Sequence, residues 1–479
     1  MVTRPRSSSS KPAAKTDTAL IAHLFRRAGF GATIDELERR SSQPYEEIVE
    51  DLVNPERFPE PDDELIRRFY PHLAANKDNP AVWNGRWFYR MINSQRPLEE
   101  KMTLFWHHVF ATGWTKSEHT PTMVDHMEML RRNGLATFST LLIELSRDPA
   151  MIYWLDNCEN HGSSINENYG REILELFSMG IGNYTEDDIK NAARAFTGWT
   201  FKQPLPLYPF GHYDSAFEYR PEDHDDGEKT FLGHTGNFNG EDIIEIIVKQ
   251  DATARFVCRH IYNFFVADEP QVPSWSITPP QDEKAMQTLV DAFLESDGDI
   301  RAVMRTLFNS DFFKQARFRR VKSPTEFIAS TLKLAGAYRE PGPGLAELEG
   351  AATAMGQKLM DPPSVEGWHT GKEWIDGGTL TERVNFAVGV VSDTSKPGIR
   401  AIIDRLRGDG KPVPPEKFVR EAIGLMQVQV TDVTEESLLD FAREEGDLTF
   451  GAPDEVKKSE QRIVRMLQLI VASREYQFA

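Results

Sequence analysis

Hydrophobic residues recur at helical spacing along most of the chain. Ile173, Leu174 and Phe177, for example, fall on one stripe that suits packing against a neighbouring helix. Helix boundaries are marked as well: Pro97 stands at the start of one apolar stretch and Gly113 just past its end. These signals predict about ten helices joined by short loops in the N-terminal part of the chain, and more helices in the C-terminal part.

The pattern changes between residues 201 and 238. This stretch is rich in Pro, Gly, His and aromatic residues, and its runs AFEYR and KTFLG flank the polar turn DHDDGE as the strands of a hairpin do. The sequence therefore predicts a mainly α fold, a multi-helix globular array with a small β-hairpin insertion around residues 216–233.

The same patterns divide the chain into five predicted parts. These are a flexible basic tail at 1–16, an N-terminal helical domain at 17–200, a long loop with the β-hairpin at 201–238, a central helical domain at 239–394 and a C-terminal helical subdomain at 395–479.

Composition and charge exclude several classes of protein. With 40% hydrophobic and 27% charged residues, the 479-residue chain is typical of a globular protein and not of a disordered or fibrous one. Its formal net charge is −19, because 55 Lys and Arg stand against 74 Asp and Glu, so we expect no nucleic-acid partner. No apolar run is long enough for a transmembrane segment, and no signal peptide is seen. We expect the chain as given to be cytoplasmic, with export of the native protein left open.

Two adjacent histidines, His107 and His108, lie in the apolar stretch WHHVFATG. Neighbouring positions on a helix point about 100° apart, so the two rings cannot reach one target. An imidazole can serve as a metal ligand or a general base near neutral pH, which makes one of the two a candidate for either role. The alternative is a structural pair, with one ring buried and hydrogen-bonded and the other exposed.

The stretch NENYGREILELFSMG places acidic side chains on one helix face. Glu172 and Glu175 are three residues apart, and Asn168 lies four before Glu172. Paired carboxylates opposite a histidine are typical of a divalent-metal site in a helical bundle, although the Glu-x-x-His repeat of that architecture is missing. Arg171 is a candidate for substrate binding, but it could also pair with Glu167. The alternative for the whole helix is a solvated acidic face with one salt bridge.

The polar turn DHDDGEKT is the densest group of potential ligands in the chain. His224, Asp225 and Asp226 supply an imidazole and two carboxylates in consecutive positions. Their spacing does not match the calcium loop of about twelve residues. A solvated hairpin turn would also carry Asp and Gly, but it would not account for the histidine and the aromatic residues nearby.

A second irregular patch, residues 359–378, is stiffened by proline and carries aromatic side chains. Trp368 and Trp374 could form a stacking surface for a sugar ring, and His369 is grouped with them as a substrate-binding candidate. The alternative is a loop that Trp368 pins to the core.

Several familiar catalytic motifs do not occur in the sequence. There is no GxSxG elbow, HExxH helix, GxGxxG turn or GxxxxGK[ST] loop. The serine-hydrolase, zincin, dinucleotide-binding and P-loop interpretations therefore lose their main support.

Long motifs along the chain resemble a bacterial family catalogued as a domain of unknown function, number 1800. They run from HLFRRAGFGAT at His23 to LIVASREYQ at Leu469, and they include KMTLFWHHVFATG, HDDGEKTFLGHTGNF and MDPPSVEGWHTGKEWI. The resemblance implies a neighbouring partner similar to alkaline phosphatases and sulfatases, beside which such proteins are often encoded. The family's helix often reads Trp-His-x-His-Phe, whereas here His108 precedes Val109, and this departure leaves His107 as the better candidate.

Two functional hypotheses follow. The first is a metal-assisted hydrolase or transferase acting on an anionic ester or carbohydrate-like substrate, in which a divalent cation polarises an oxygen while a carboxylate or imidazole moves the proton. The second is a non-catalytic helical scaffold that binds the phosphatase- or sulfatase-like partner or a glycan. A redox or haem protein is a weaker third, with no axial-ligand motif beyond the histidines.

The catalytic hypothesis assigns roles to residues from distant segments. The catalytic candidates are His107, Glu172 and His224. The candidate metal ligands are His107, Glu172, Glu175, Asp225 and Asp226. The substrate-binding candidates are Arg171, Trp368, His369 and Trp374. The hypothesis predicts that the catalytic candidates converge on one ion, whereas the scaffold hypothesis predicts that they lie apart.

Overall fold

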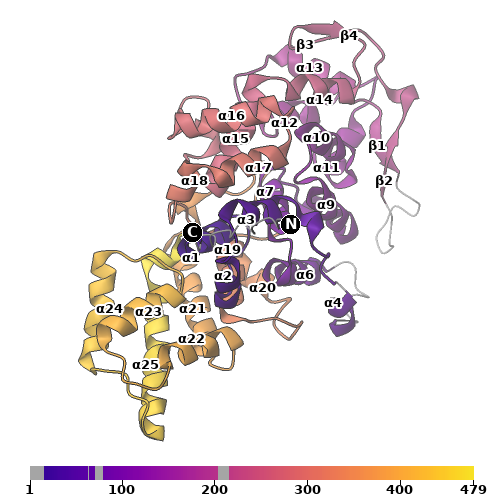
Figure 1. The fold of residues 1–479 in the computed structure, drawn as a ribbon. Helices are drawn as coiled ribbons and strands as arrows, with labels where there is room; N and C mark the ends of the chain where they lie inside the picture. Colours follow the sequence, from indigo (N-terminus) through magenta and orange to yellow (C-terminus); the bar gives the residue numbers. More distant parts are fainter. Residues whose placement is uncertain (1–15, 63, 71–78, 203–214) are drawn as a thin grey trace, which may run out of the picture.

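The structure is a computed structural model (Figure 1). It describes residues 16–62, 64–70, 79–202 and 215–479. The basic tail predicted at 1–16 lies outside the described residues apart from Thr16, and so does the middle of the predicted long loop, residues 203–214.

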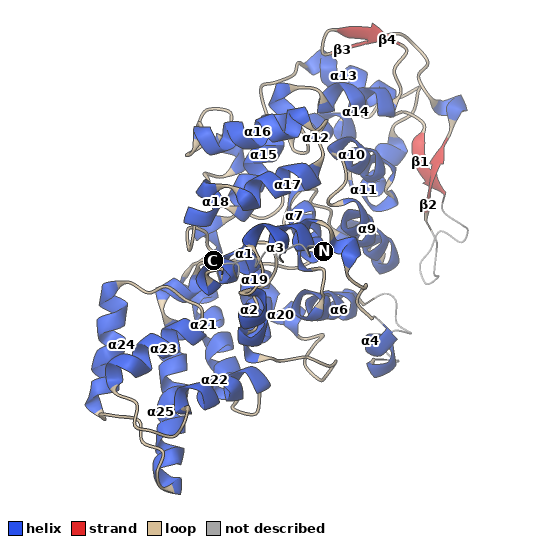
Figure 2. Ribbon diagram, viewed as in Figure 1, coloured by secondary structure: helices blue, strands red, loops and turns tan. Residues whose placement is uncertain are grey.

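Helices dominate the described chain (Figure 2), which confirms the predicted mainly α fold. The first group is α1 (Thr18–Arg27), α2 (Ile34–Arg40), α3 (Tyr45–Val53), α4 (Glu64–Phe69), α6 (Pro80–Asn93), α7 (Pro97–Val109), α8 (Trp114–Ser117), α9 (Thr120–Asn133), α10 (Phe138–Arg147), α11 (Pro149–Trp154), α12 (Asn168–Glu175) and α13 (Glu186–Ala195).

The second group follows a β insertion. It is α14 (Gly240–Val248), α15 (Asp251–Phe265), α16 (Glu283–Glu295), α17 (Ile300–Asn309), α18 (Asp311–Gln315), α19 (Pro324–Ala335), α20 (Leu348–Ala354), α21 (Gly377–Ser392), α22 (Pro397–Arg407), α23 (Pro415–Leu425), α24 (Asp432–Glu444) and α25 (Pro453–Ala472). Short 3-10 turns lie at Pro55–Arg57, Asn157–Glu159, Pro221–Asp223, Val272–Ser274, Gly371–Trp374 and Arg474–Gln477. No helix in the described ranges is long and apolar enough to cross a bilayer.

The β insertion consists of two small antiparallel ribbons. β1 (Trp199–Lys202) pairs with β2 (Ala216–Tyr219), and β3 (Lys229–Phe231) pairs with β4 (His234–Gly236). A small β insertion is thus confirmed, but the two predicted strands, now β2 and β3, do not pair with each other. The turn between them is held instead by α13, because Arg194 binds Asp225 with Nε 2.7 Å from Oδ2.

One hydrophobic core joins the parts of the molecule. Its buried side chains run from Ile21 in α1 to Tyr476 near the C-terminus, and they include residues of both helix groups. The boundaries of the predicted domains stay predictions. The helices α22 to α25 lie together at one end of the molecule, and α21 packs against α25 (Figure 1).

Helix α7 is buried on nearly all sides. Trp106 stacks on Phe110, with 5.0 Å between ring centroids and 7° between ring planes, and Phe105 packs on Phe264 of α15 at 5.3 Å. A helix that is covered all round belongs to the interior of a protein. Its two histidines, His107 and His108, are therefore core residues.

Candidate functional site

His107 lies in the core and does not face a cavity that a substrate could enter. It is fully buried, and the backbone N–H of Met360 donates to its Nε2 at 3.0 Å. Burial, with His126 and His108 nearby, lowers the pKa of His107 to about 3. Because the Nε2 lone pair accepts this bond and the ring is neutral near pH 7, His107 suits neither metal binding through Nε2 nor general base catalysis.

His108 is also a core residue. Burial is the main reason that its pKa falls to about 4, and the charge of Arg320 adds to this effect. Its ring lies parallel to Trp368, with 6.3 Å between centroids. The alternative in which one ring is exposed does not hold in full, because α7 is covered on both sides and both histidines are buried.

The turn at 223–226 is attached to α13. His224 Nδ1 lies 2.9 Å from the carbonyl oxygen of Thr197, and both carboxylate oxygens of Asp225 accept from Arg194. This ion pair lowers the pKa of Asp225. Figure 1 shows the turn at the end of the molecule beside β3, whereas α7 lies in the middle. The turn is thus held in place by its hydrogen bonds and ion pair with residues 194 and 197, and not by a shared site with α7.

The aromatic patch is pinned to the core. Trp368 and Trp374 are both buried and pack with Val321. Trp368 also meets the His107 ring edge-on, with centroids 5.3 Å apart. His369 is exposed and pairs with Glu373 one turn later. The alternative of a loop anchored by Trp368 describes this geometry, and a sugar-stacking surface made of the two tryptophans does not.

The predicted divalent-metal site does not assemble. No group of three or more His, Cys, Asp or Glu side chains suited to a metal ion occurs among the residues that the structure describes. His107 is committed to Met360, and Asp225 is committed to Arg194. The predicted ligands therefore do not fit one metal ion, because they do not gather at one place and two of them, His107 and Asp225, already bond within the protein.

Arg171 lies on the surface and takes part in ion pairs. Its guanidinium binds both carboxylate oxygens of Glu186, at 3.1 and 2.8 Å, and it lies 3.8 Å from Glu167. The predicted pairing with Glu167 therefore forms as a long contact. Its bonds to Glu186 tie α12 to α13 and do not offer the guanidinium to a substrate.

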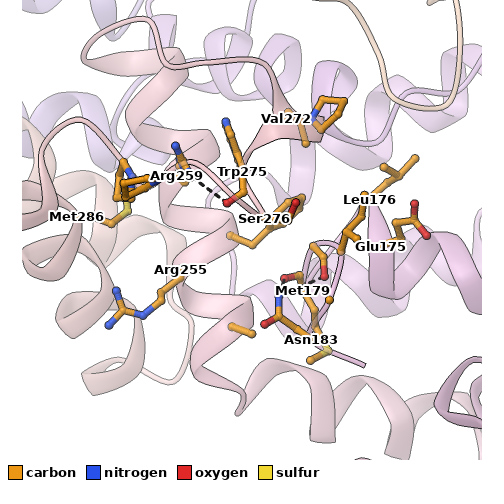
Figure 3. Close-up of a pocket in the computed structure, with 18 of the residues that line it drawn as sticks. Glu175, Leu176, Met179, Asn183, Arg255, Arg259, Val272, Trp275, Ser276 and Met286 are labelled. Carbon is orange, nitrogen blue, oxygen red and sulfur yellow. Dashed lines mark hydrogen bonds between the residues drawn. The ribbon is translucent and has the colours of Figure 1, made fainter. Parts of the chain in front are cut away.

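A pocket of about 410 Å³ opens where α12 ends, and it is closed on the other side by α15, α16 and the segment before α16. Figure 3 shows Glu175 reaching in from one side, while Arg259 and Trp275 come from the other. A pocket of this size is typical of small-molecule sites. It is the place where the predicted acidic helix meets a cavity.

Three carboxyl groups gather at this pocket. Glu175 and Glu366 line it, and Glu172 stands one turn before Glu175 on α12. Burial, together with the negative charges of Glu175 and Glu366, raises the pKa of Glu172 to about 7, although the charge of Arg171 opposes this shift. Glu172 thus keeps its proton up to about pH 7, well above the range of an ordinary glutamate. The prediction that Glu172 and Glu175 share one face is confirmed, and Glu366 joins them from a distant loop.

Close backbone contacts hold the two carboxylate-bearing segments in place. Gly367 has φ +81°, and a Cβ there would lie 2.4 Å from the carbonyl oxygen of His108. Gly180 has φ +76°, and its Cβ would lie 2.7 Å from the ring of Phe256 in α15. Both positions need glycine, because a side chain would disfavour the positive φ of the backbone and would clash with the neighbouring atom. Glu366 is therefore fixed against α7, and the end of α12 against α15.

Glu175 is oriented by a phenol. The hydroxyl of Tyr184 donates to Glu175 Oε2 at 2.9 Å. This bond leaves the second carboxylate oxygen available to the pocket. Glu172 and Glu175 therefore differ in their surroundings although they lie on one helix face.

The opposite wall carries two guanidinium groups whose charges are matched. Arg259 binds the buried Glu269 through Nε and Nη2, at 3.0 and 2.8 Å. Arg255 pairs with Asp251 and Glu283. The pocket lining holds three carboxylates, Glu175, Glu283 and Glu366, against these two cations. Its charge balance favours a neutral or cationic ligand over an anionic one.

Trp275 supplies the aromatic wall of the pocket. Its indole N–H donates to the carbonyl oxygen of Pro270 at 2.7 Å, and Arg259 lies 4.7 Å from its ring centroid. The ring packs against His260, with centroids 4.6 Å apart. These contacts fix its orientation, as a ring that stacks on a sugar requires.

Sequence reasoning missed this second wall. Arg259 and Glu283 stand in sequence patterns typical of ordinary helices, Trp275 stands in a loop, and Glu366 belongs to the motif MDPPSVEGWHTGKEWI without a residue pattern that gives it a role. One signal is present: the segment PQVPSWSITPPQ, at 270–281, is proline-rich and carries a tryptophan, like the patch at 359–378.

Comparisons with known proteins give one family and no individual relatives. No curated protein and no solved structure matches the chain. One family model matches residues 23–478, nearly the whole chain, and it is described as a protein of unknown function, DUF1800. The predicted resemblance is therefore confirmed, and the chain belongs to the DUF1800 family.

Proposed function

We propose that the pocket between α12 and α15 is a hydrolytic site for a neutral, carbohydrate-like substrate, with Glu172 as the proton donor. The observation that carries the proposal is the position of Glu172, a carboxyl group with a pKa near 7 that stands one turn before Glu175 on α12, while Glu175 and Glu366 line a pocket with an aromatic wall. Two carboxyl groups with different proton affinities are the working parts of most enzymes that cleave glycosidic bonds.

The reaction divides into two proton transfers. Glu172, protonated near neutral pH, gives its proton to the oxygen that leaves as the glycosidic carbon–oxygen bond breaks. Glu175, oriented by Tyr184, takes the proton of the water whose oxygen forms the new bond to that carbon. Trp275 supports the sugar ring. The overall reaction consumes one water molecule and produces two hydroxyl groups, one on each product.

The charge of the pocket selects the substrate class. An anionic ester would approach Glu175, Glu283 and Glu366, whereas the two arginines of the wall are already paired with carboxylates. A neutral glycan meets no such repulsion. The charge balance therefore supports the carbohydrate branch of the original hypothesis over the anionic-ester branch.

The test is hydrolysis of neutral oligosaccharides and polysaccharides, followed by the release of new reducing ends. We expect Glu172→Gln to lower kcat at least about 100-fold, because glutamine cannot donate a proton. Glu167→Gln, at the N-cap of the same helix and two turns away from the pocket-lining Glu175, is the matched control and should keep wild-type activity.

The pH profile gives a second readout on the same enzyme. Activity should fall as the pH rises above about 7, because Glu172 then loses the proton that it donates. A chelator should leave the rate unchanged, since the mechanism uses no metal. Equal activity of wild type and Glu172→Gln on a cleaved substrate would contradict the proposal.

A scaffold that binds a phosphatase- or sulfatase-like protein is the second candidate function. One observation favours it: Val433 and Leu469 are 79% and 42% exposed beside a groove of about 740 Å³ near the C-terminus. Exposed apolar residues at a groove are typical of protein contacts. Binding of such a partner should weaken in Val433→Asp and stay unchanged in Glu172→Gln, which separates this role from hydrolysis.

A further inference from the structure

Positive charge exceeds negative charge in the interior where α1 ends and α19 begins. Two carboxylates, Glu326 and Asp268, lie among these cations. The basic side chains are Arg26, Arg27, Lys101, Arg320, Lys322 and Arg383, and burial lowers the pKa of Lys322 to about 7. Buried ions are costly unless they are paired, so an excess of one sign calls for a counterion.

The carboxylate at the centre of this cluster is fully used. Glu326 accepts from Arg320 Nη1 with both oxygens, at 2.8 and 2.6 Å, and it also accepts from Lys101 and from the backbone N–H of Ser323. These bonds pair one carboxylate with both Lys101 and Arg320. Among the described residues, Arg26, Arg27, Lys322 and Arg383 have no bonded carboxylate.

Arg26 and Lys322 line one small cavity of about 30 Å³. Arg26 donates through Nη1 to the carbonyl oxygen of Gln427 at 3.1 Å, and its buried Nε has no hydrogen-bond partner in the described structure. Lys322, which is 5% exposed, donates to the carbonyl oxygen of Tyr476 at 2.9 Å. Two of the three N–H groups of the lysine are then left for a ligand.

The backbone around this cavity is held in unusual conformations. Gln427 and Phe318 both line it, and their φ angles are +56° and +57°. Non-glycine residues rarely adopt such angles unless the surrounding structure imposes them. Gln427 also donates through Nε2 to the carbonyl oxygen of Ala32, at 2.9 Å, so the loop is tied to the end of α1.

We propose that this cavity is an anion site that binds one monovalent anion of the size of chloride between Arg26 and Lys322. A single water needs about 10–15 Å³ of such space, so about 30 Å³ has room for one halide ion but not for a whole phosphate ester or nucleotide. The donors come from α1 and from the segment before α19, and the C-terminal Tyr476 shares the cavity. The bound anion therefore stabilises the contact between the N-terminal helix and the C-terminal segments.

The test uses the full chain in sodium gluconate, whose anion is too large for the cavity. Replacing gluconate by chloride or bromide at constant ionic strength should raise the Tm along a saturating curve by about 1–3 °C. A crystal grown in bromide should show an anomalous scattering peak between Arg26 and Lys322.

Variants assign the effect to this cavity. Lys322→Met and Arg26→Gln should each lose the halide-dependent rise in Tm, whereas Lys417→Met, an exposed lysine on α23, should keep it. If Lys322→Met does not fold, Arg26→Gln alone gives the answer. The proposal is overturned if the Tm is the same in halide and in gluconate and the bromide crystal shows no anomalous peak. Water alone would then fill the cavity.

Discussion

The two nitrogens of the His107 ring have different surroundings. Nε2 accepts from the Met360 N–H, so a neutral ring carries its proton on Nδ1, which is buried without a hydrogen-bond partner among the described residues. His126, which affects His107 electrostatically, bonds through Nδ1 to Asp148 at 2.8 Å. Each ring therefore has one tautomer fixed by its neighbour.

This geometry predicts the protonation of His107. Long-range nitrogen–proton NMR spectra of histidine-labelled protein should show its Nδ1–H tautomer, with no titration between pH 5 and 8, because burial holds its pKa near 3. The exposed His369 provides the reference signal in the same sample. Titration of the His107 signal near pH 6.5 would contradict the assignment.

The sequence could not decide the role of His107. Adjacent histidines in an apolar stretch look the same whether the ring binds a ligand or is buried. The deciding group is the N–H of Met360, which is 253 positions away along the chain and reaches the ring only through the fold.

At the scale of elements, the start of α19 combines a helix cap with a buried ion cluster. Ser323 Oγ accepts from the N–H of Glu326, and Glu326 returns a bond to the N–H of Ser323. Although burial alone would raise the pKa of Glu326, Arg320 and Lys101 hold it well below its ordinary value. One carboxylate therefore caps the helix and pairs with two cations.

Removing this charge should be costly. We expect Glu326→Gln to lower the free energy of unfolding by about 3–5 kcal/mol, because it leaves Lys101 and Arg320 buried without their carboxylate. Urea unfolding measures the change. The exposed Glu382→Gln on α21 should differ from wild type by less than about 0.5 kcal/mol. A loss below about 1 kcal/mol in Glu326→Gln would show that the cluster does not depend on this charge.

Local signals predicted helices better than pairings between elements. Thr185 forms a capping box with Asp188, and Pro97 occupies the first turn of α7, as their sequence positions indicate. The partner of β2 was not predictable from adjacent sequence. It is β1, which stands before residues 203–214, and the prolines of this long stretch gave no short turn that would join the two strands.

At the scale of the whole molecule, several histidines are buried in the neutral form. Burial lowers the pKa of His23 to about 2, of His107 to about 3 and of His108 to about 4, and it places that of His260 well below its ordinary value. In the unfolded chain each titrates near 6.5. Between about pH 6.5 and 4 the unfolded chain therefore binds more protons, and stability falls as the pH falls.

We expect the molecule to be acid-sensitive in this window. Each buried histidine contributes a slope of up to about 1.4 kcal/mol per pH unit. Glu172 acts in the opposite direction. Because its pKa is raised, the folded chain binds up to one more proton at this group than the unfolded chain does, and this contribution to stability grows as the pH falls. Urea unfolding at pH 7.5, 6.5 and 5.5 measures the slope, and His260→Phe should make it shallower. A free energy of unfolding that is constant over this range would contradict the prediction.

The sequence could predict half of the candidate site. Glu172 and Glu175 share a face because helical periodicity places them there, and periodicity can be read directly from the sequence. The opposite wall, with Arg259 and Trp275, depends on how α15 and the segment before α16 fold back onto the end of α12. Such long-range packing leaves no local pattern, so the predicted site joined the acidic helix to the wrong partners.

The measurement that tests the central claim most directly is the pKa of the Glu172 carboxyl group. A carbon NMR titration of glutamate-labelled protein, with Glu172→Gln used to assign the signal, gives this value without knowledge of the substrate. The account predicts a pKa of about 7, and a lower one in Glu175→Gln, where a neighbouring negative charge is lost. A pKa near the ordinary value of about 4.3 would contradict the role of Glu172 as proton donor.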